Sequence, residues 1–374
     1  MLKFVPIGGF LGAGKTTTMI AAAKALEARG ETVAVITNDQ GTDLVDTQLA
    51  QAAQVDSVSE VTGGCFCCRF DDLAAVIDEV VSTRNPSVVL AEAVGSCTDL
   101  QSTVVRPLRT LHGDQLSVAP LAVLVDPLRY AAMSSEWRSG DSAGQDGGSS
   151  GPPESDMAYL YRHQLDEADV IVVNKADLLP DGGTGLAHQV QERFPHAQVL
   201  LASAKDGTGL PDLLQLWSTG SEGSSHRAFD IDYDRYGAAE AELAWTNQTF
   251  TTTASGDSEF RPGDWADSFL ASLNDQAGEV DATIGHVKLR TETSDGPIKA
   301  SLTGADGATY DDRHSLGSQA AAWTLNARVA MTPDELDAAI ARAADAADAA
   351  CATATSSRAG DIFQPGFPVP VHRM

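Results

Sequence analysis

Gly9-Phe10-Leu11-Gly12-Ala13-Gly14-Lys15-Thr16 (GFLGAGKT) matches the pattern G-x-x-x-x-G-K-[ST] in full. The stretch stands between an apolar segment, residues 2–8, and an Ala- and Leu-containing segment, residues 15–29. In this context the pattern predicts a β-strand, a phosphate-binding loop and a helix. Glycines allow backbone N–H groups to surround phosphate oxygens, and the start of the helix adds partial positive charge.

The loop predicts a nucleoside triphosphate site. We expect Lys15 to reach the β- and γ-phosphates and the Thr16 hydroxyl to hold Mg²⁺. The remaining loop residues expected to contact the phosphates are Gly9, Gly12, Ala13 and Gly14. The alternative, a glycine-rich turn without a ligand, does not account for the strand before the loop and the helix after it.

The chain continues with apolar runs that are typical of buried parallel strands. These runs occupy residues 32–37, 55–61, 87–92, 120–125, 169–174 and 198–202. A helix is predicted over 71–84, where Leu73, Val76, Ile77 and Val80 have helical spacing. The alternation predicts an α/β fold, a doubly wound P-loop domain with a mainly parallel sheet over residues 1–222. Gly-, Ser-, Asp- and Pro-rich residues 139–156 are expected to be a mobile insertion in that domain.

A different pattern follows a predicted linker, residues 223–239. Strand-like segments at 243–253, 283–293, 297–303 and 322–330 mostly alternate, and helix-like segments occupy 263–274 and 332–351. We therefore predict a smaller α+β domain over 240–374, with two helices on one side of one sheet. Thr332, Pro333 and Glu335 predict a capping box at the start of the second helix.

The alternation also assigns faces within this sheet. Val287 and Leu289 are expected to face the helices. His286, Lys288, Arg290, Asn326 and Arg328 are expected on the opposite face. Their charges are interpreted either as a docking face or as scattered solvated charge.

Asn174-Lys175-Ala176-Asp177, directly after an apolar strand, predicts guanine as the base. The Asp177 carboxylate can accept hydrogen bonds from the guanine N1–H and exocyclic amine, a donor pair that adenine lacks. Ser203 and Ala204, followed by Lys205, resemble a second guanine-loop motif. A chance match in a surface turn is the alternative.

Acidic loops follow other strands. Glu92-Ala93-Val94-Gly95 predicts a carboxylate that orients Mg²⁺ or the attacking water and a Gly95 N–H that senses the γ-phosphate. Asn38-Asp39-Gln40-Gly41 is expected at the same sheet edge, because the carboxyl ends of parallel strands meet there. Asp126 ends another strand, and for it a polar cap that starts the next loop and a site role stay equally open.

Three of the five cysteines, Cys65, Cys67 and Cys68, fall within GGCFCC. Clustered thiolates near a helix start are soft ligands for Zn²⁺, Co²⁺ or Cu(I). Three local sulfurs do not close a tetrahedral site, so a fourth ligand could be Asp39, a histidine, water or a partner. A redox-sensing thiol group is the alternative. Cys97 and Cys351 are expected to be small buried side chains.

Composition excludes several classes of function. Asp plus Glu number 52 against 25 Lys plus Arg, a formal net charge of −27, which disfavours nucleic acid and anionic membrane surfaces as partners. No run of 18 apolar residues and no signal-peptide pattern is present, so we expect a cytoplasmic protein. The 36 Asp against 7 Lys indicate a halophilic surface adapted to high intracellular salt.

GGFLGAGKTT, GGCFCC, EAVG and NKAD, in this order, resemble the CobW-like family of P-loop GTPases, which are relatives of the nickel-inserting GTPases of urease and hydrogenase maturation. FRPGDW at 260–265, IGHVKLR at 284–290 and the segments at 363–366 and 370–373 resemble the family's C-terminal domain more loosely. Two departures stand out: the loop Asn38–Gly41 usually reads Asn-Glu-Phe-Gly, which puts Asp39 as a ligand in question, and a histidine-rich tract is absent.

The resemblance implies a GTP-hydrolysing metallochaperone that uses GTP and Mg²⁺ and delivers Zn²⁺ or Co²⁺ to a client metalloenzyme or a metal-cofactor pathway protein. The residues it implies for phosphate and Mg²⁺ are Gly12, Gly14, Lys15, Thr16 and Thr17. It implies Glu92 and Gly95 for the second phosphate motif, Asn174, Lys175 and Asp177 for guanine, and Cys65, Cys67 and Cys68 for the metal.

No arginine finger is evident near the loop, so fast turnover is expected to need a partner or a homodimer mate. The alternatives are a metal-responsive GTP-switch regulatory protein without metal delivery and a small-molecule kinase, which NKAD disfavours.

Overall fold

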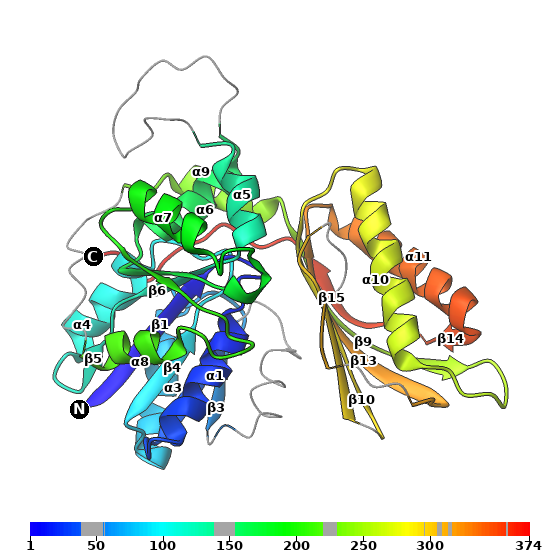
Figure 1. Ribbon diagram of the computed structural model, residues 1–374, viewed down its shortest axis with the longest axis horizontal. Helices are drawn as coiled ribbons and strands as arrows, with labels where there is room; N and C mark the ends of the chain where they lie inside the picture. Colours follow the sequence, from blue (N-terminus) through cyan, green and yellow to red (C-terminus); the bar gives the residue numbers. More distant parts are fainter. Residues whose placement is uncertain are drawn as a thin grey trace. The chain divides into compact units, whose positions relative to one another are not determined.

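A computed structural model describes residues 1–38, 55, 57–137, 154–219, 230–294, 296–304, 309–312, 316–356 and 358–374 (Figure 1). Among these residues the chain forms two compact units. The first contains the described residues up to Ala239 together with Phe367–Met374, and the second contains Glu240–Gly366. The sequence-based division instead placed all of 240–374 in the second domain. Asp39 and the insertion predicted at 139–156, apart from its last three residues, lie outside the described residues.

The first unit is built on a parallel sheet with the order β3-β2-β4-β1-β6-β7-β8, in which β5 also pairs with β1. Its strands are β1 (Leu2–Gly9), β2 (Val33–Asn38), β3 (Val58–Val61), β4 (Val88–Glu92), β5 (Leu116–Val118), β6 (Ala122–Val125), β7 (Val170–Val173) and β8 (Gln198–Leu201). All the strands predicted for this domain are present, and the short β5 was missed because three residues carry too little periodicity to be recognised.

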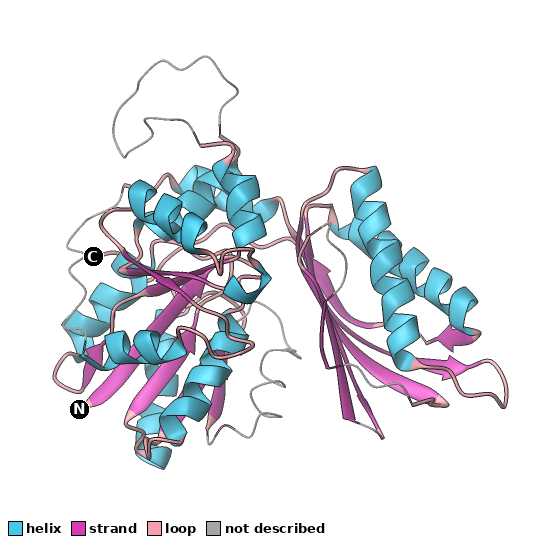
Figure 2. Ribbon diagram, viewed as in Figure 1, coloured by secondary structure: helices cyan, strands magenta, loops and turns pink. Residues whose placement is uncertain are grey.

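Helices lie on both faces of this sheet (Figure 2). They are α1 (Lys15–Glu27), α3 (Phe70–Arg84), α4 (Arg106–His112), α5 (Pro127–Ser134), α6 (Asp156–Asp166), α7 (Thr184–Arg193), α8 (Leu210–Thr219) and α9 (Tyr233–Ala241), with the short turns η1 (Gln101–Val105) and η2 (Ala176–Leu178). Met19 of α1 and Trp217 of α8 share a core with Val5 and Leu90 of the sheet. Burial on both faces explains why these strands read as continuous apolar runs.

The second unit is an antiparallel sheet with the order β12-β11-β10-β13-β9-β14, in which β15 also pairs with β9. Its elements are β9 (Ala244–Ala254), α10 (Pro262–Glu279), β10 (Ile284–Thr293), β11 (Gly296–Leu302), β12 (Thr309–Asp312), β13 (Ala320–Val329), α11 (Pro333–Cys351), β14 (Thr353–Thr355) and β15 (Ala359–Phe363). Both helices lie on one side of the sheet, as predicted (Figure 1). The predicted fold class, a doubly wound α/β domain followed by a smaller α+β domain, is confirmed.

The core of the second unit forms between this sheet and its helices. Val287 and Leu289 of β10 pack in one cluster with Trp265 of α10 and Ile340 of α11, as the alternation predicted. Helix α11 begins with the predicted capping box, in which the Thr332 N–H donates to Glu335 Oε2 at 2.9 Å.

The opposite face of the sheet differs from the prediction of exposed charge. His286, Arg290 and Arg328 are buried, and the Arg328 guanidinium lies 4.1 Å from the centre of the Trp245 ring. Arg328 also donates to the Thr246 carbonyl at 2.9 Å. These contacts contradict an exposed basic stripe, because alternation gives the face of a side chain but not what covers it.

Among the described helices, none has the length and apolar character needed to cross a bilayer.

Candidate nucleotide and metal site

The phosphate loop joins the end of β1 to the start of α1, as the motif predicts. Gly14, directly before α1, has φ 89°, a conformation that favours glycine. A Cβ at Gly14 would lie 2.4 Å from Asn174 Nδ2, so the loop also needs glycine for a close approach. Lys15 Nζ donates to the carbonyls of Gly9 and Phe10, at 2.8 and 3.2 Å. The ammonium is thus held against the loop in which a P-loop protein binds phosphates.

The two predicted magnesium-site residues meet. Thr16 Oγ1 donates to Glu92 Oε1 at 3.0 Å, and both residues are buried. A hydroxyl and a carboxylate oxygen at one point are the hard donors that suit Mg²⁺. Thr17, the next residue of α1, is half-buried.

Asn174 connects the predicted guanine loop to the phosphate loop. Its Nδ2 donates to the Ala13 carbonyl at 2.9 Å, and its Oδ1 accepts from the Ala204 N–H at 3.1 Å. The buried Ser203 accepts from the Asp206 N–H through its hydroxyl. The structure therefore gives Asn174 a role in fixing three loops together, which the sequence motif alone does not state.

Lys175 and Asp177 lie on either side of Ala176 at the start of η2. Lys175 Nζ lies 2.6 Å from Asp126 Oδ2, whereas Asp177 is exposed. Asp126 Oδ1 also accepts from the Arg129 N–H at 2.9 Å and so caps α5. Asp126 therefore caps α5 and also pairs with Lys175 of the predicted guanine motif.

Gly95 lies directly against the phosphate loop. A Cβ at this position would come within 2.6 Å of Leu11 Cδ2 and 3.0 Å of the Leu11 backbone nitrogen. Gln164 Nε2 of α6 donates to the carbonyls of Gly95 and Cys97, at 2.9 and 2.8 Å. The segment after β4 is thereby fixed between the phosphate loop and α6.

Cys65, Cys67 and Cys68 bring their sulfurs together between β3 and α3. All three Sγ atoms lie within 4.8 Å of one another. The separations are 2.7 Å for Cys65–Cys67, 3.3 Å for Cys65–Cys68 and 3.7 Å for Cys67–Cys68. Tetrahedral zinc with bonds of about 2.3 Å needs sulfurs about 3.8 Å apart, so outward shifts of about 1 Å or less would fit the ion.

Asn38 at the end of β2 holds this cysteine loop. Its Nδ2 donates to the carbonyls of Val61 and Gly64, at 3.0 and 2.8 Å, and its Oδ1 accepts from the Phe66 N–H at 2.9 Å. The sequence pointed to Asp39 in this loop as a ligand. Asp39 lies outside the described residues, and the neighbouring Asn38 shapes the cysteine loop because its amide both donates and accepts.

The thiols of the cluster differ in how their pKa values are shifted. Hydrogen bonds with Cys67 and then with Cys68 lower the pKa of Cys65, and burial opposes this shift. The bond to Cys65 raises the pKa of Cys68 to about 11. The pKa values of Cys65 and Cys68 are therefore shifted in opposite directions within one cluster.

Cys97 is a further thiol near the cysteine cluster, and the sequence did not single it out. It is buried as expected, but its thiol interacts with those of Cys65 and Cys67, although it lies outside the tight group of three. The only signal in the sequence is its place two residues after Gly95, at the carboxyl end of β4. Cys351 is half-buried in the second unit.

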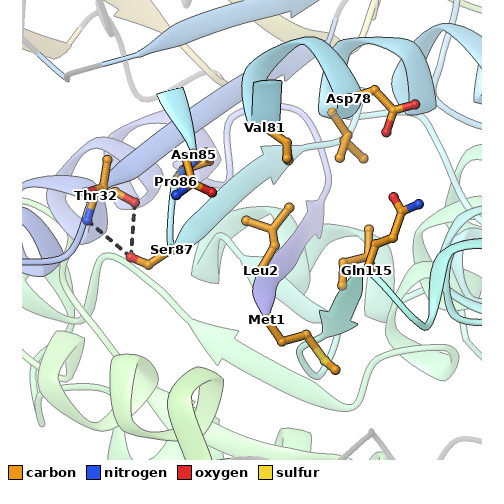
Figure 3. Close-up of a pocket in the computed structure, with 11 residues that line it drawn as sticks. Met1, Leu2, Thr32, Asp78, Val81, Asn85, Pro86, Ser87 and Gln115 are labelled. Carbon is orange, nitrogen blue, oxygen red and sulfur yellow. Dashed lines mark hydrogen bonds between the residues drawn. The ribbon is translucent and has the colours of Figure 1, made fainter. Parts of the chain in front are cut away.

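A pocket of about 460 Å³ lies elsewhere in the first unit (Figure 3). Leu2, Thr32, Ser87 and Leu116, which line it, stand at or just before the starts of parallel strands. Thr32 and Ser87 are hydrogen-bonded to each other at its rim, at 3.2 Å. The pocket is thus at the edge opposite the phosphate loop, where this class of fold does not bind its nucleotide.

Comparison with known proteins identifies a family profile and sequence relatives that are similar to this chain. Residues 3–200 match the family profile described as "CobW/HypB/UreG, nucleotide-binding domain". A protein of Sinorhizobium sp. named zinc chaperone CobW is 27% identical over 235 residues, which cover 58% of this chain and 62% of that protein. Zinc-regulated GTPase metalloprotein activator 1 of Dictyostelium discoideum is 24% identical over 191 residues, covering 47% of this chain and 40% of the relative. The chain thus spans less than two thirds of the length of these relatives.

Among solved structures, Zn(II)-bound YjiA GTPase from E. coli is 14% identical, with a TM-score of 0.38, and the match covers 91% of this chain and 98% of that one.

Proposed function

This chain belongs to the CobW/HypB/UreG family of nucleotide-binding domains, and from that premise we propose that it is a GTPase that binds Zn²⁺ at Cys65, Cys67 and Cys68 and delivers it to a client metalloenzyme. The observation that carries the proposal is the convergence of three sulfurs within 4.8 Å in the unit that also contains the phosphate loop. Both features come from loops that follow parallel strands, where α/β folds bind ligands.

Zinc is the proposed cargo, with Co²⁺ as the alternative. Soft thiolate ligands favour Zn²⁺. The two relatives carry zinc in their names, which supports the choice. A site of three local sulfurs keeps one position open, which suits transfer better than permanent structure.

A fourth sulfur is available from Cys97. Its thiol already interacts with Cys65 and Cys67, and its backbone carbonyl is held by Gln164. We propose that Cys97 supports the cysteine loop from the segment after β4 without closing the site, so that the fourth position on the ion stays open for transfer. Because Cys97 is two residues from Gly95, movement of this segment would change the metal site directly.

The proposed nucleotide chemistry is hydrolysis of GTP to GDP and phosphate. Water attacks the γ-phosphorus, and the bond from that phosphorus to the β–γ bridging oxygen breaks. Lys15 binds the phosphates, the Gly95 N–H senses the γ-phosphate, and Asp177 reads the guanine edge. Thr16 and Glu92 would hold Mg²⁺, which neutralises phosphate charge when bound.

The metal test is a Zn²⁺ titration in competition with a chromophoric chelator, with GDP and with a non-hydrolysable GTP analogue. The wild type is expected to bind one Zn²⁺, with affinities that differ about 5–150-fold between the two nucleotides. Cys67→Ser with Cys68→Ser should abolish this site, Cys97→Ser should weaken it, and Cys351→Ser is the matched control that should leave it intact. Equal affinity with both nucleotides, or undiminished binding in the double variant, would contradict the proposal.

A metal-responsive regulator without delivery is the second candidate, because three thiols can equally sense a metal. The Zn²⁺-loaded protein is therefore incubated with an apo-metalloenzyme, with GTP or with its non-hydrolysable analogue. Delivery predicts client activation that needs hydrolysis. Retention of the metal in both cases favours the regulator.

A further inference from the structure

The last eight residues of the chain, Phe367–Met374, return to the first unit and lie against the cysteine loop. The Val369 N–H donates to Cys68 Sγ at 3.3 Å. The Val371 N–H donates to the Cys67 carbonyl at 2.9 Å. Two of the three proposed zinc ligands therefore contact the backbone of a segment about 300 residues away in sequence, one through its sulfur and the other through its carbonyl.

Further contacts hold this segment on both sides of the cluster. The His372 ring meets the Phe70 ring edge-on, with centroids 5.0 Å apart. Phe70 starts α3, two residues after Cys68. The Met374 N–H donates to the Ser102 carbonyl at 2.9 Å in η1. The segment thus connects the helix after the cysteines with the turn after β4.

Arg373 and Asp99 form the charged anchor of this segment. Arg373 Nε donates to Asp99 Oδ2 at 2.7 Å, and the Asp99 side chain is 1% exposed. The Tyr233 hydroxyl donates to the same oxygen at 2.9 Å. A buried carboxylate is costly unless it is paired, so Arg373 and Tyr233 stabilise Asp99 in this position. The bond to Asp99 in turn raises the pKa of Arg373.

Asp99 also belongs to the segment after β4, which contacts the phosphate loop at Gly95. Gly95 contacts Leu11, Cys97 reaches the sulfur cluster, and Asp99 follows two residues later. Glu167 accepts from Thr98 Oγ1 at 3.1 Å and from the Gln101 N–H at 2.9 Å, on either side of Asp99. A shift of this segment would therefore move the anchor of residues 367–374.

We propose that residues 367–374 form a strap that positions the cysteine ligands and that Asp99 ties this strap to the nucleotide-sensing segment. For its metal part the proposal rests on the proposed function. The N–H of Val369 holds Cys68 Sγ in one orientation, and Arg373 is a positioning residue that acts through Asp99. Partners of this kind around a metal site are worth about 10–100-fold in metal affinity.

Four variants of the full chain separate the contacts. Val369→Pro removes the N–H donor, and Val369→Ala is its matched control because it keeps the donor. Arg373→Ala removes the anchor. Arg358→Ala is the control for it, because Arg358 forms an ion pair of the same 2.7 Å length with Asp337 in the second unit. Arg373→Lys, which keeps the charge, should restore part of the effect of Arg373→Ala.

Two readouts are used for each variant. Zn²⁺ affinity is expected to fall about tenfold in Val369→Pro and Arg373→Ala and to stay unchanged in both controls, with GTP affinity unaltered throughout. Amide hydrogen exchange of the metal-free protein is expected to accelerate at residues 63–70 and 367–374 in Arg373→Ala. In the wild type the exchange of 367–374 should differ between GDP and the non-hydrolysable GTP analogue.

The two readouts distinguish the two hypotheses. Unchanged exchange at 63–70 in Arg373→Ala, or Zn²⁺ affinity equal to wild type in Val369→Pro, overturns the strap. A wild type that binds no Zn²⁺ at the three cysteines overturns the proposed function, while the exchange data from metal-free protein still decide whether the strap positions the loop.

Discussion

The side-chain amide of Asn174 donates to the backbone carbonyl of Ala13 over 2.9 Å, so the guanine motif is tied directly to the phosphate loop. The other end of the same amide accepts from Ala204. One buried side chain thus sets the distance between the expected positions of the base and the phosphates.

Asn174→Ala should release this connection. It leaves the Ala13 carbonyl and the Ala204 N–H without their partner, at a cost of about 1–3 kcal/mol in unfolding free energy. Guanine nucleotide affinity should fall by about tenfold or more. Fluorescent GDP titration and urea unfolding measure the two effects, with Asn274→Ala in α10 as control. Affinity equal to that of the control would show that the connection is dispensable.

Gly95→Ala should disturb the contact with the phosphate loop, because the new Cβ would lie within 3.0 Å of the Leu11 backbone nitrogen. We expect weaker binding of the GTP analogue, with less effect on GDP, since Gly95 is proposed to sense the γ-phosphate. Gly278→Ala in helix α10 is the control, because nothing lies within 4 Å of its added Cβ. That variant should gain about 0.5–1 kcal/mol in stability. Equal losses for both nucleotides in Gly95→Ala would argue against sensing.

The substitution Asp126→Asn removes the ion pair with Lys175 and keeps the helix cap of α5. Asparagine still caps α5, whereas Lys175 loses its carboxylate partner at 2.6 Å. Stability should change by about 1 kcal/mol or less, and nucleotide dissociation should become faster. Asp126→Ala removes the cap as well, so it should lose about 1 kcal/mol more. Stopped-flow nucleotide dissociation and thermal unfolding provide the measurements. If Asp126→Asn releases nucleotide at the wild-type rate, the pairing of Lys175 with Asp126 does not contribute to nucleotide binding.

The shifted pKa of His163 leads us to expect a lower free energy of unfolding in mild acid. Burial, and then the charges of Arg162 and Arg235, lower its pKa to about 3 in the folded protein. Below about pH 6.5 the unfolded chain takes up a proton at His163 that the folded protein does not, so stability falls as the pH falls. The contribution is about 2 kcal/mol between pH 7 and pH 5. Urea unfolding at the two pH values should show this difference reduced in His163→Gln but not in His188→Gln, and an equal pH dependence in all three proteins would refute it.

Salt should stabilise the whole chain. Its formal net charge is −27, and the Debye length shortens from about 10 Å at 0.1 M to about 3 Å at 1 M ionic strength. The midpoint of thermal unfolding should therefore rise steadily with KCl concentration. Full stability in dilute buffer would contradict the inference of a halophilic surface.

Much of the fold could be predicted from local pattern. GFLGAGKT specified a strand, a loop and a helix, and apolar runs located most strands, because their periodicity reflects burial on one or two faces. The elements that escaped prediction, such as β5 and β15, are short strands whose pairing depends on distant partners. Likewise, alternation assigned Arg328 to the face away from the helices, but it could not show that Trp245 covers it.

The sequence by itself determined which side chains are available: a lysine and a threonine in a phosphate-loop motif, a carboxylate in a guanine-type motif and three clustered thiols of the kind that suit a soft metal. Tertiary structure alone decided which groups act together. Asn38 shapes the cysteine loop, Cys97 interacts with the sulfurs from the segment after β4, and the Val369 N–H donates to Cys68 from a segment about 300 residues away in sequence. Short motifs record residues that are close along the chain, whereas contacts between loops arise only when β-strand order brings distant segments to one edge of a sheet.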